Sequence, residues 1–327
     1  MTSDPSPRKR VRIVGTGGTI ARIPASGVLP AAGLVEDIGR LHPGLDLRSH
    51  ADLEFADVLA VGSERFTPPD WVLVAGEIRD AVADDHVSGV VLTHGTFTVE
   101  ETAYFLHLTI GSRKPLVIAC SQRPHTSIGN DGDRNLLDAI RVAADDDAVG
   151  MGTLLVVNES IHSARGVRKT SGRPDGFVSG TTGVLGYVDS ERVTFYTSPL
   201  RRHSHLSEFT IPASLPRVEV VATYAGADGT AVRAFIDQGV DGVVVNGFSF
   251  NGMPHHMQEE ALREAAAAGI AVVVVNRGGD GRIAPDAYNE GFVRGDNLSA
   301  QQARVLLLVA LANGCPVDDL QRVFDQY

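Results

Sequence analysis

The chain has 327 residues, of which 43% are hydrophobic and 21% charged, ordinary values for a globular protein. Its net charge of −11 disfavours nucleic acid as the main partner, because phosphate binding needs a basic face. The two cysteines, Cys120 and Cys315, exclude a disulfide scaffold and a metal site built from cysteines. No apolar run predicts a membrane span, and the polar N-terminus does not resemble a secretory signal, so we expect a cytoplasmic enzyme or binding protein.

Short β-branched runs alternate with longer helical patterns in the first part of the chain. Strands are predicted at 11–14, 89–93, 116–120 and 154–158, and helices at 71–82, 99–110 and 135–144. Such alternation is typical of βαβ units with a parallel sheet. We therefore predict an α/β fold with a larger N-terminal parallel-sheet domain over residues 1–205.

A second series follows an irregular stretch that contains Pro212 and Pro216. Strands are predicted at 218–223, 242–246 and 271–276, and helices at 229–238, 257–268, 299–313 and 317–324. We predict a linker at 206–216 and a smaller C-terminal α/β domain at 217–327.

The first motif, Gly15-Thr16-Gly17-Gly18-Thr19, follows the first predicted strand. It begins like a dinucleotide fingerprint, but Ile20 occupies the third glycine position, where the helix must approach the strand closely. A tight strand–helix turn is one interpretation. The alternative is that the turn exposes the hydroxyl of Thr19 at the carboxyl end of the strand, where open α/β sheets bind ligands.

The second motif, His94-Gly95-Thr96, connects the strand at 89–93 to the helix at 99–110. Thr96 therefore lies near a helix N-terminus, which favours developing negative charge, although a threonine there can also serve only as a cap. Lys169 lies in a polar loop, where it is either a surface lysine or a base for a threonine if burial lowers its pKa. Adjacent His255 and His256 do not face the same way on a regular element, so we predict no metal site there.

Together these segments resemble the bacterial-type L-asparaginase/glutaminase family, the threonine amidohydrolases, of which the chain looks like a divergent member. The resemblance runs through nearly the whole chain in the family's order. The matching stretches are Gly15–Ala21, Val61–Ser63, His94–Thr96 with Glu100–Thr102, Arg123-Pro124 with Asp131-Gly132, Val167–Thr170, Arg201–His203 and Ala303–Leu307.

The resemblance implies a two-domain asparaginase-like fold and a homodimer or homotetramer with active sites shared between subunits. It implies that Thr19 is the nucleophile and that Thr96 and Lys169 form an activating or water-handling pair. Neither a metal nor an organic cofactor is implied. The expected substrate-binding residues are Gly18, Gly62, Ser63, Glu64, Gly95, Phe97, Phe248 and Ser249, with Ser63 on the substrate carboxylate.

Four departures from the family pattern bear on the substrate. Phe97 stands where the family has an aspartate that binds the substrate α-amino group and partners the lysine. Residues 20–35 contain no tyrosine to support the nucleophile, and Glu64 replaces a glutamine. The stretch 247–252 reads Gly-Phe-Ser-Phe-Asn-Gly instead of the family's Gly-x-Gly-Asn-Gly.

Because Phe97 removes a carboxylate and adds an apolar ring, we expect the pKa of Lys169 to fall. For the same reason we expect an amidohydrolase whose small-molecule substrate, a linear or cyclic amide, lacks a free α-amino group. The alternatives are a weak true L-asparaginase and a non-catalytic ligand-binding homologue. A nicotinamide-dependent oxidoreductase is disfavoured by Ile20.

Overall fold

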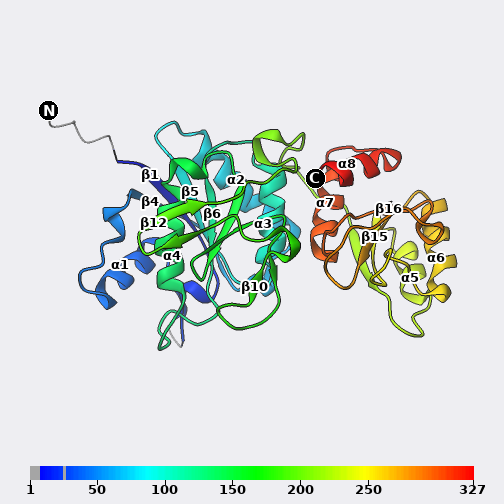
Figure 1. Cartoon of the computed structure of the whole chain (residues 1–327), viewed down its shortest axis with the longest axis horizontal. Helices are drawn as coiled ribbons and strands as arrows, with labels where there is room; N and C mark the ends of the chain where they lie inside the picture. Colours follow the sequence, from blue (N-terminus) through cyan, green and yellow to red (C-terminus); the bar gives the residue numbers. More distant parts are fainter. Residues whose placement is uncertain (1–7, 25–26) are drawn as a thin grey trace. The chain divides into compact units, whose positions relative to one another are not determined.

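The computed structural model describes residues 8–24 and 27–327, and the chain divides into two compact units, Met1–Leu200 and Arg201–Tyr327. The first unit is built on an eight-stranded sheet in the order β12-β11-β8-β7-β6-β5-β1-β4 (Figure 1). The parallel part contains β4 (Asp52–Val61), β1 (Arg10–Gly17), β5 (Gly89–Thr93), β6 (Leu116–Ala119) and β7 (Thr153–Val157). The antiparallel part contains β8 (Ser160–Ser163), β11 (Gly186–Asp189) and β12 (Arg192–Phe195).

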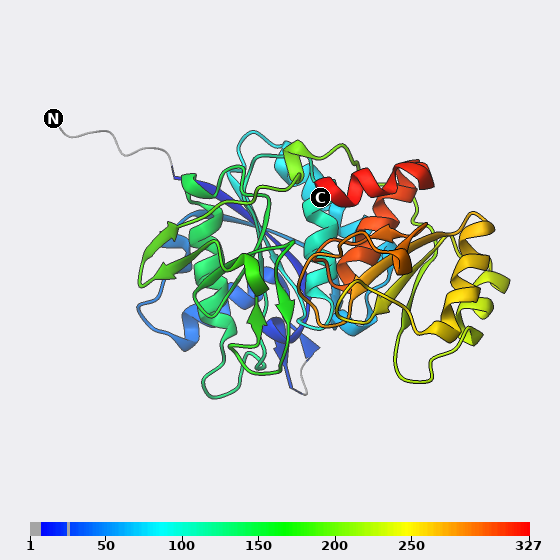
Figure 2. The ribbon, with the colours of Figure 1, turned by 45° about the vertical axis from the view of Figure 1, so that its right-hand side comes forward.

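Helices cover both faces of this sheet (Figure 2). One face is covered by α1 (Ala31–Leu41) and α4 (Gly132–Ala143), and the other by α2 (Pro68–Ala83) and α3 (Val99–Thr109). The helix α1 turns Leu34, Val35 and Ile38 inward at helical spacing, where they join one core with alternate residues of the strands. Because both faces of the central strands are buried, β5, β6 and β7 are continuous apolar runs.

The second unit has a four-stranded parallel sheet, β13-β14-β15-β16. Its strands are β13 (Val218–Ala222), β14 (Gly242–Gly247), β15 (Ala271–Asn276) and β16 (Val293–Arg294). Its helices are α5 (Thr230–Asp237), α6 (His256–Ala267), α7 (Ala300–Ala312) and α8 (Leu320–Gln326). Valines of the strands pack with α5 and α6 into a separate core. Each unit therefore contains its own buried core.

The predicted α/β class, with a large sheet dominated by parallel strands and a smaller second domain, is confirmed. The structure adds elements that the sequence analysis did not predict: α1, the edge strand β4 and the antiparallel strands β8, β11 and β12. The stretch 201–216 packs within the second unit, since Tyr327 Oη accepts the main-chain N–H of Glu208 at 2.7 Å.

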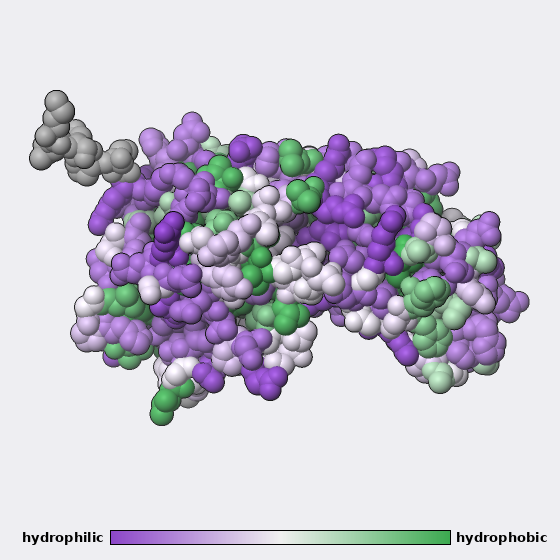
Figure 3. Space-filling model, in the orientation of Figure 1, coloured by the Kyte–Doolittle hydropathy of each residue, from purple (hydrophilic) through white to green (hydrophobic). Residues whose placement is uncertain are grey.

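Polar side chains dominate the face drawn in Figure 3, where hydrophobic residues form small separate groups. Within residues 8–24 and 27–327, no helix is both long and apolar enough to cross a membrane.

Candidate active site

Two glycine turns meet at the carboxyl end of the first unit's sheet. The strands β1 and β5 are parallel neighbours, so the turns that follow them emerge side by side. A methyl group added to Gly18 would lie 2.6 Å from the Cα of Gly95, and Gly18 has a φ of +80°. Only glycine fits this position, because both the space and the backbone angle exclude a side chain. The contact brings together the two turns that carry Thr19 and Thr96.

A third turn, which follows β4, packs against the same place. A methyl group on Gly95 would lie 2.6 Å from Ser63 Oγ, and Ser63 itself is buried. The Ser63 hydroxyl oxygen accepts the main-chain N–H groups of Phe97 at 3.0 Å and Thr98 at 3.4 Å. The Ser63 hydroxyl oxygen thus accepts two main-chain N–H groups just after Thr96 and holds the backbone of this turn.

Lys169 reaches the second turn from a separate hairpin. It belongs to β9 (Arg168–Lys169), which pairs with β10 (Phe177–Val178). The ammonium Nζ of Lys169 donates to Thr96 Oγ1 at 2.6 Å. Burial holds the pKa of Lys169 below its ordinary value, the direction expected from the sequence. A less basic lysine beside a hydroxyl is suited to proton transfer.

The ring of Phe97 contributes differently from the sequence expectation. Lys169 Nζ lies 4.6 Å from the ring centroid, in a cation–π arrangement that favours the charged amine. The side chain of Phe97 is 66% exposed. Burial of Lys169 is the cause that lowers its pKa, while the charge of Glu100 acts in the opposite direction.

Thr19 is half-buried and begins the short 3₁₀ turn Thr19–Ala21. Its hydroxyl makes no side-chain hydrogen bond to any residue in the described parts of the chain. The residue after it, Ile20, packs against the start of α4, since a methyl on Gly132 would lie 3.0 Å from Ile20 Cγ1. The first turn thus places a half-buried hydroxyl, with no hydrogen-bond partner among the described residues, beside the turn that carries Thr96.

A buried relay, which the sequence analysis missed, supports the Gly95 turn. Trp71 Nε1 donates to Thr102 Oγ1 at 3.0 Å, and Thr102 Oγ1 lies 3.0 Å from His94 Nε2. His94 Nδ1 donates to the carbonyl oxygen of Gly95 at 2.7 Å. Burial lowers the pKa of His94 to about 4, so the ring is neutral. Its Nδ1 carries the proton that it donates to Gly95, and its Nε2 accepts from the Thr102 hydroxyl. The relay fixes the backbone immediately before Thr96.

Two further expected binding residues, Gly62 and Glu64, follow β4. Glu64 is exposed, and its carboxylate folds back over the Cα of Gly62.

The remaining expected binding residues lie in the second unit. Phe248 and Ser249 follow β14, and the guanidinium carbon of Arg277 lies 4.7 Å from the Phe248 ring centroid. Phe250 is 83% exposed. His255 caps helix α6, since its Nδ1 accepts the main-chain N–H of Met257 at 3.3 Å. No group of three or more His, Cys, Asp or Glu is arranged to hold a metal within residues 8–24 and 27–327.

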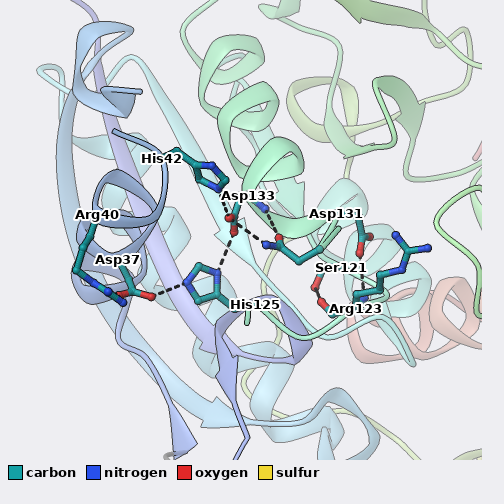
Figure 4. Close-up of polar contacts among 9 residues, drawn as sticks. Asp37, Arg40, His42, Ser121, Arg123, His125, Asp131 and Asp133 are labelled. Atoms are coloured by element: carbon teal, nitrogen blue, oxygen red, sulfur yellow. Dashed lines mark hydrogen bonds and ion pairs between the residues drawn. The ribbon is translucent and has the colours of Figure 1, made fainter. Parts of the chain in front are cut away.

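A second polar cluster lies in the loop before α4, as Figure 4 shows. His125 is fully buried, with Nδ1 2.9 Å from Asp133 Oδ1 and Nε2 2.9 Å from Asp37 Oδ2. Both ring nitrogens face carboxylates, so the ring is an imidazolium that donates from each. The hydrogen bond to Asp133 raises the pKa of His125 above its ordinary value.

The carboxylates of this cluster have further partners. Asp37 accepts from Arg40 Nε at 2.9 Å, and Asp133 lies 2.8 Å from His42 Nε2 and accepts from Asn130 Nδ2 at 3.1 Å. The pKa of Asp37 is lowered, chiefly by its hydrogen bond to Arg40. Burial acts to raise the pKa of Asp133, but its hydrogen bonds outweigh burial and lower it. The cluster ties α1 to α4 beside a cavity of about 630 Å³.

Asp131 shapes the same loop at the side of the candidate site. Its carboxylate accepts the main-chain N–H groups of Gln122 and Arg123, each at 2.9 Å. Gln122 in turn donates from Nε2 to the carbonyl of Ser171 at 3.1 Å. The loop thereby contacts the hairpin that carries Lys169.

Comparison with known proteins assigns this arrangement to a family. Residues 10–201 match the family model "Asparaginase, N-terminal", and residues 217–324 match "Glutaminase/Asparaginase C-terminal domain". L-asparaginase 2 of Bacillus subtilis is 34% identical over 97% of this chain and 86% of its own length. L-asparaginase 2 of Escherichia coli is 34% identical over 97% of this chain and 93% of its own length.

Among solved structures, the probable cytoplasmic L-asparaginase from Campylobacter jejuni superimposes with a TM-score of 0.89. It is 35% identical and the match covers 98% of this chain and all of that one. The chain belongs to the asparaginase/glutaminase family, and it is an asparaginase-like hydrolase that acts on amides.

Proposed function

We propose that this protein hydrolyses a C–N amide bond with Thr19 as the nucleophile, and that its substrate is a linear or cyclic amide without a free α-amino group. The observation that carries the proposal is the 2.6 Å hydrogen bond between Lys169 Nζ and Thr96 Oγ1. A hydroxyl and a lysine of lowered pKa meet beside the turn of Thr19, while Phe97 directly follows Thr96.

In the first half of the reaction, Thr19 Oγ1 attacks the amide carbonyl carbon, and the proton that it loses is transferred to the amide nitrogen. The C–N bond then breaks and an ester to Thr19 remains. The protonated nitrogen leaves as ammonia or an amine from a linear amide and stays attached to the acyl group in a cyclic one. The N-terminus of α3 stabilises negative charge on the carbonyl oxygen during this step.

In the second half, a water molecule attacks the ester carbonyl. Thr96 takes a proton from the water and passes its own proton to Lys169, whose lowered pKa makes the neutral amine accessible. The ester bond breaks, Thr19 regains its proton, and the carboxylic acid leaves. The hydroxyl proton of Ser63 binds a carboxylate of the substrate throughout.

The substrate class follows from the environment of Phe97. An amino acid bound there places its ammonium group against an aromatic ring that already contacts the Lys169 amine. A cation–π contact returns about 0.5–2 kcal/mol. The ring, which is 66% exposed, offers no carboxylate, so the ammonium group loses water on binding without gaining an ion-pair partner. A substrate with hydrogen or an apolar group in that place avoids this cost.

A release assay for ammonia tests the proposal. Succinamate, which is the asparagine skeleton without its α-amino group, is compared with L-asparagine and L-glutamine by ammonia release. Cyclic imides are followed by loss of the imide itself, because opening the ring releases no ammonia. We expect a higher kcat/KM for amides that lack the amino group. A kcat/KM on L-asparagine near roughly 10⁴ M⁻¹s⁻¹ would contradict the substrate class, since that value is typical of enzymes on their own substrates.

The second candidate is a weak true L-asparaginase. It is favoured by the names of the similar proteins and by Glu64, whose exposed carboxylate can pair with a substrate ammonium group. In that case Glu64→Gln lowers kcat/KM for L-asparagine and leaves succinamate unaffected.

We further propose an active homodimer or homotetramer in the cytoplasm. The Thr19 hydroxyl has no hydrogen-bonding base among the described residues of its own chain, and exposed Phe250 suits a contact with a neighbouring subunit. The cytoplasmic relative from C. jejuni supports the location. A fully active monomer in sedimentation at assay concentration would contradict a shared site.

A further inference from the structure

We propose that Glu100 is a positioning residue for amide hydrolysis. Its carboxylate binds the main-chain N–H of Lys169, whose amino group binds Thr96. This inference rests on the proposed function. Glu100 Oε2 accepts the main-chain N–H of Lys169 at 3.2 Å, and Lys169 Nζ donates to Thr96 Oγ1 at 2.6 Å. The two contacts come from residues four apart in the sequence. The short stretch 96–100 therefore binds both the main chain and the amino group of Lys169.

The hairpin that carries Lys169 needs such an anchor. Its strands β9 and β10 have two residues each, and an isolated two-stranded hairpin is marginally stable in water. The Gln122–Ser171 contact fixes the neighbouring loop, whereas the Glu100 contact acts at Lys169 itself. The carboxylate thus sets how far the amine reaches toward Thr96.

Glu100 also supplies negative charge near the lysine, where Phe97 supplies none. The pKa of Glu100 is raised to about 7, chiefly by burial and also by the charge of Glu101. The main-chain hydrogen bond from Lys169 and the charges of Arg168 and Lys169 act in the opposite direction. Ionised Glu100 raises the pKa of Lys169, so loss of this charge lowers it. The state of Glu100 is therefore coupled to the state of the amine.

A labelling experiment measures this coupling without relying on activity. The chain has three lysines, Lys9, Lys114 and Lys169, so trace acetylation across pH, followed by mass spectrometry, reports the pKa of each amine. We expect Glu100→Gln to lower the pKa of Lys169 only. The control Glu36→Gln, on the exposed face of α1, is expected to leave all three amines unchanged.

Kinetics with succinamate or the best amide of the screen separate positioning from binding. We expect Glu100→Ala to lower kcat roughly 10²-fold with KM unchanged, because a small displacement of a catalytic group has such an effect. Glu100→Gln keeps an oxygen acceptor for the Lys169 N–H, so it restores most of kcat with a shifted pH profile.

Each result decides a different statement. An unchanged pKa of Lys169 in Glu100→Gln, or wild-type kcat in Glu100→Ala, would overturn the positioning role. A labelling shift in a protein that hydrolyses none of the amides would overturn the hydrolytic function and leave the contact between Glu100 and Lys169 established.

Discussion

The first unit holds two polar regions that use charge in opposite ways. Around His125, each ionised group faces an opposite charge, and the bonds join α1 to α4. Around Thr96, one lysine of lowered pKa donates to a hydroxyl and lies over an aromatic ring. Fully paired charges stabilise one arrangement, whereas a lysine without a close carboxylate partner at its amine can change its protonation state. Incomplete pairing therefore marks the region suited to chemistry.

The largest effect is expected for Thr19→Ala. Removing the attacking hydroxyl should lower turnover by several orders of magnitude, as for other essential nucleophiles, and change the urea midpoint little. Thr19→Ser keeps a hydroxyl and serves as the matched control. Near wild-type turnover in Thr19→Ala would move the nucleophile to Thr96, and activity in both alanine variants would reject the threonine mechanism.

Lys169→Met is expected to have the second-largest effect, a loss of roughly 10²–10⁴-fold in kcat, which is the range for general acid–base catalysis. In the wild type, activity should rise with pH as the lysine loses its proton, at a pH below its ordinary pKa of 10.5. This rise of activity with pH should be missing from the pH–rate profile of Lys169→Met. An unchanged profile would argue against the base role. The control is Lys9→Met, at a partly exposed lysine that pairs with Asp146.

The paired region should respond in stability instead of rate. His125→Leu removes both donors from two carboxylates, and breaking a buried ion pair costs about 3–5 kcal/mol. Because Asp37 keeps Arg40 and Asp133 keeps Asn130, we expect about 3 kcal/mol in the free energy of unfolding. Urea denaturation measures this, with His86→Leu at an exposed position as control. A change equal to that of the control would show that the cluster does not stabilise the fold.

Phe97→Asp should give the site a paired charge like that of the His125 cluster. The new carboxylate can bind a substrate ammonium group and the Lys169 amine, so preference should shift toward L-asparagine and the pKa of Lys169 should rise. The ratio of kcat/KM for L-asparagine to that for succinamate measures the shift. Phe97→Leu, which adds no charge, should leave the ratio nearly unchanged; an equal shift in both variants would contradict the argument.

The smallest effect is the pH dependence of the His125 cluster. The folded pKa of His125 is raised, so its contribution is full below its ordinary value of 6.5 and is lost as pH rises through the folded value. The folded pKa values of Asp37 and Asp133 are lowered, so their contributions are present above 3.8 and are lost as pH falls through the folded values. The stability difference between wild type and His125→Leu should therefore be largest between about pH 3.8 and 6.5. A flat difference would contradict this assignment of charge.

The sequence by itself determined the central strands, the helices other than α1, and both glycine turns. The strands β5 and β15 match their predicted ranges, because long β-branched runs are local signals that survive in the fold. The edge strand β4 was missed although Asp52–Val61 mixes charged and apolar residues, which is typical of a half-exposed strand. The antiparallel strands were missed because each is short and contains polar residues, whereas β6, of the same length, is entirely apolar.

Only the tertiary structure decided which polar groups meet. Thr96 and Lys169 are 73 residues apart, and His125 and Asp37 are 88 apart, so no local pattern links them. Sheet order places β4, β1 and β5 side by side, and this order depends on non-local pairing and helix packing. The sequence therefore predicted the hydroxyls and the lysine as site residues. Only folding brings Glu100 to the main chain of Lys169 and His125 to two carboxylates, because burial and distance are properties of the packed chain.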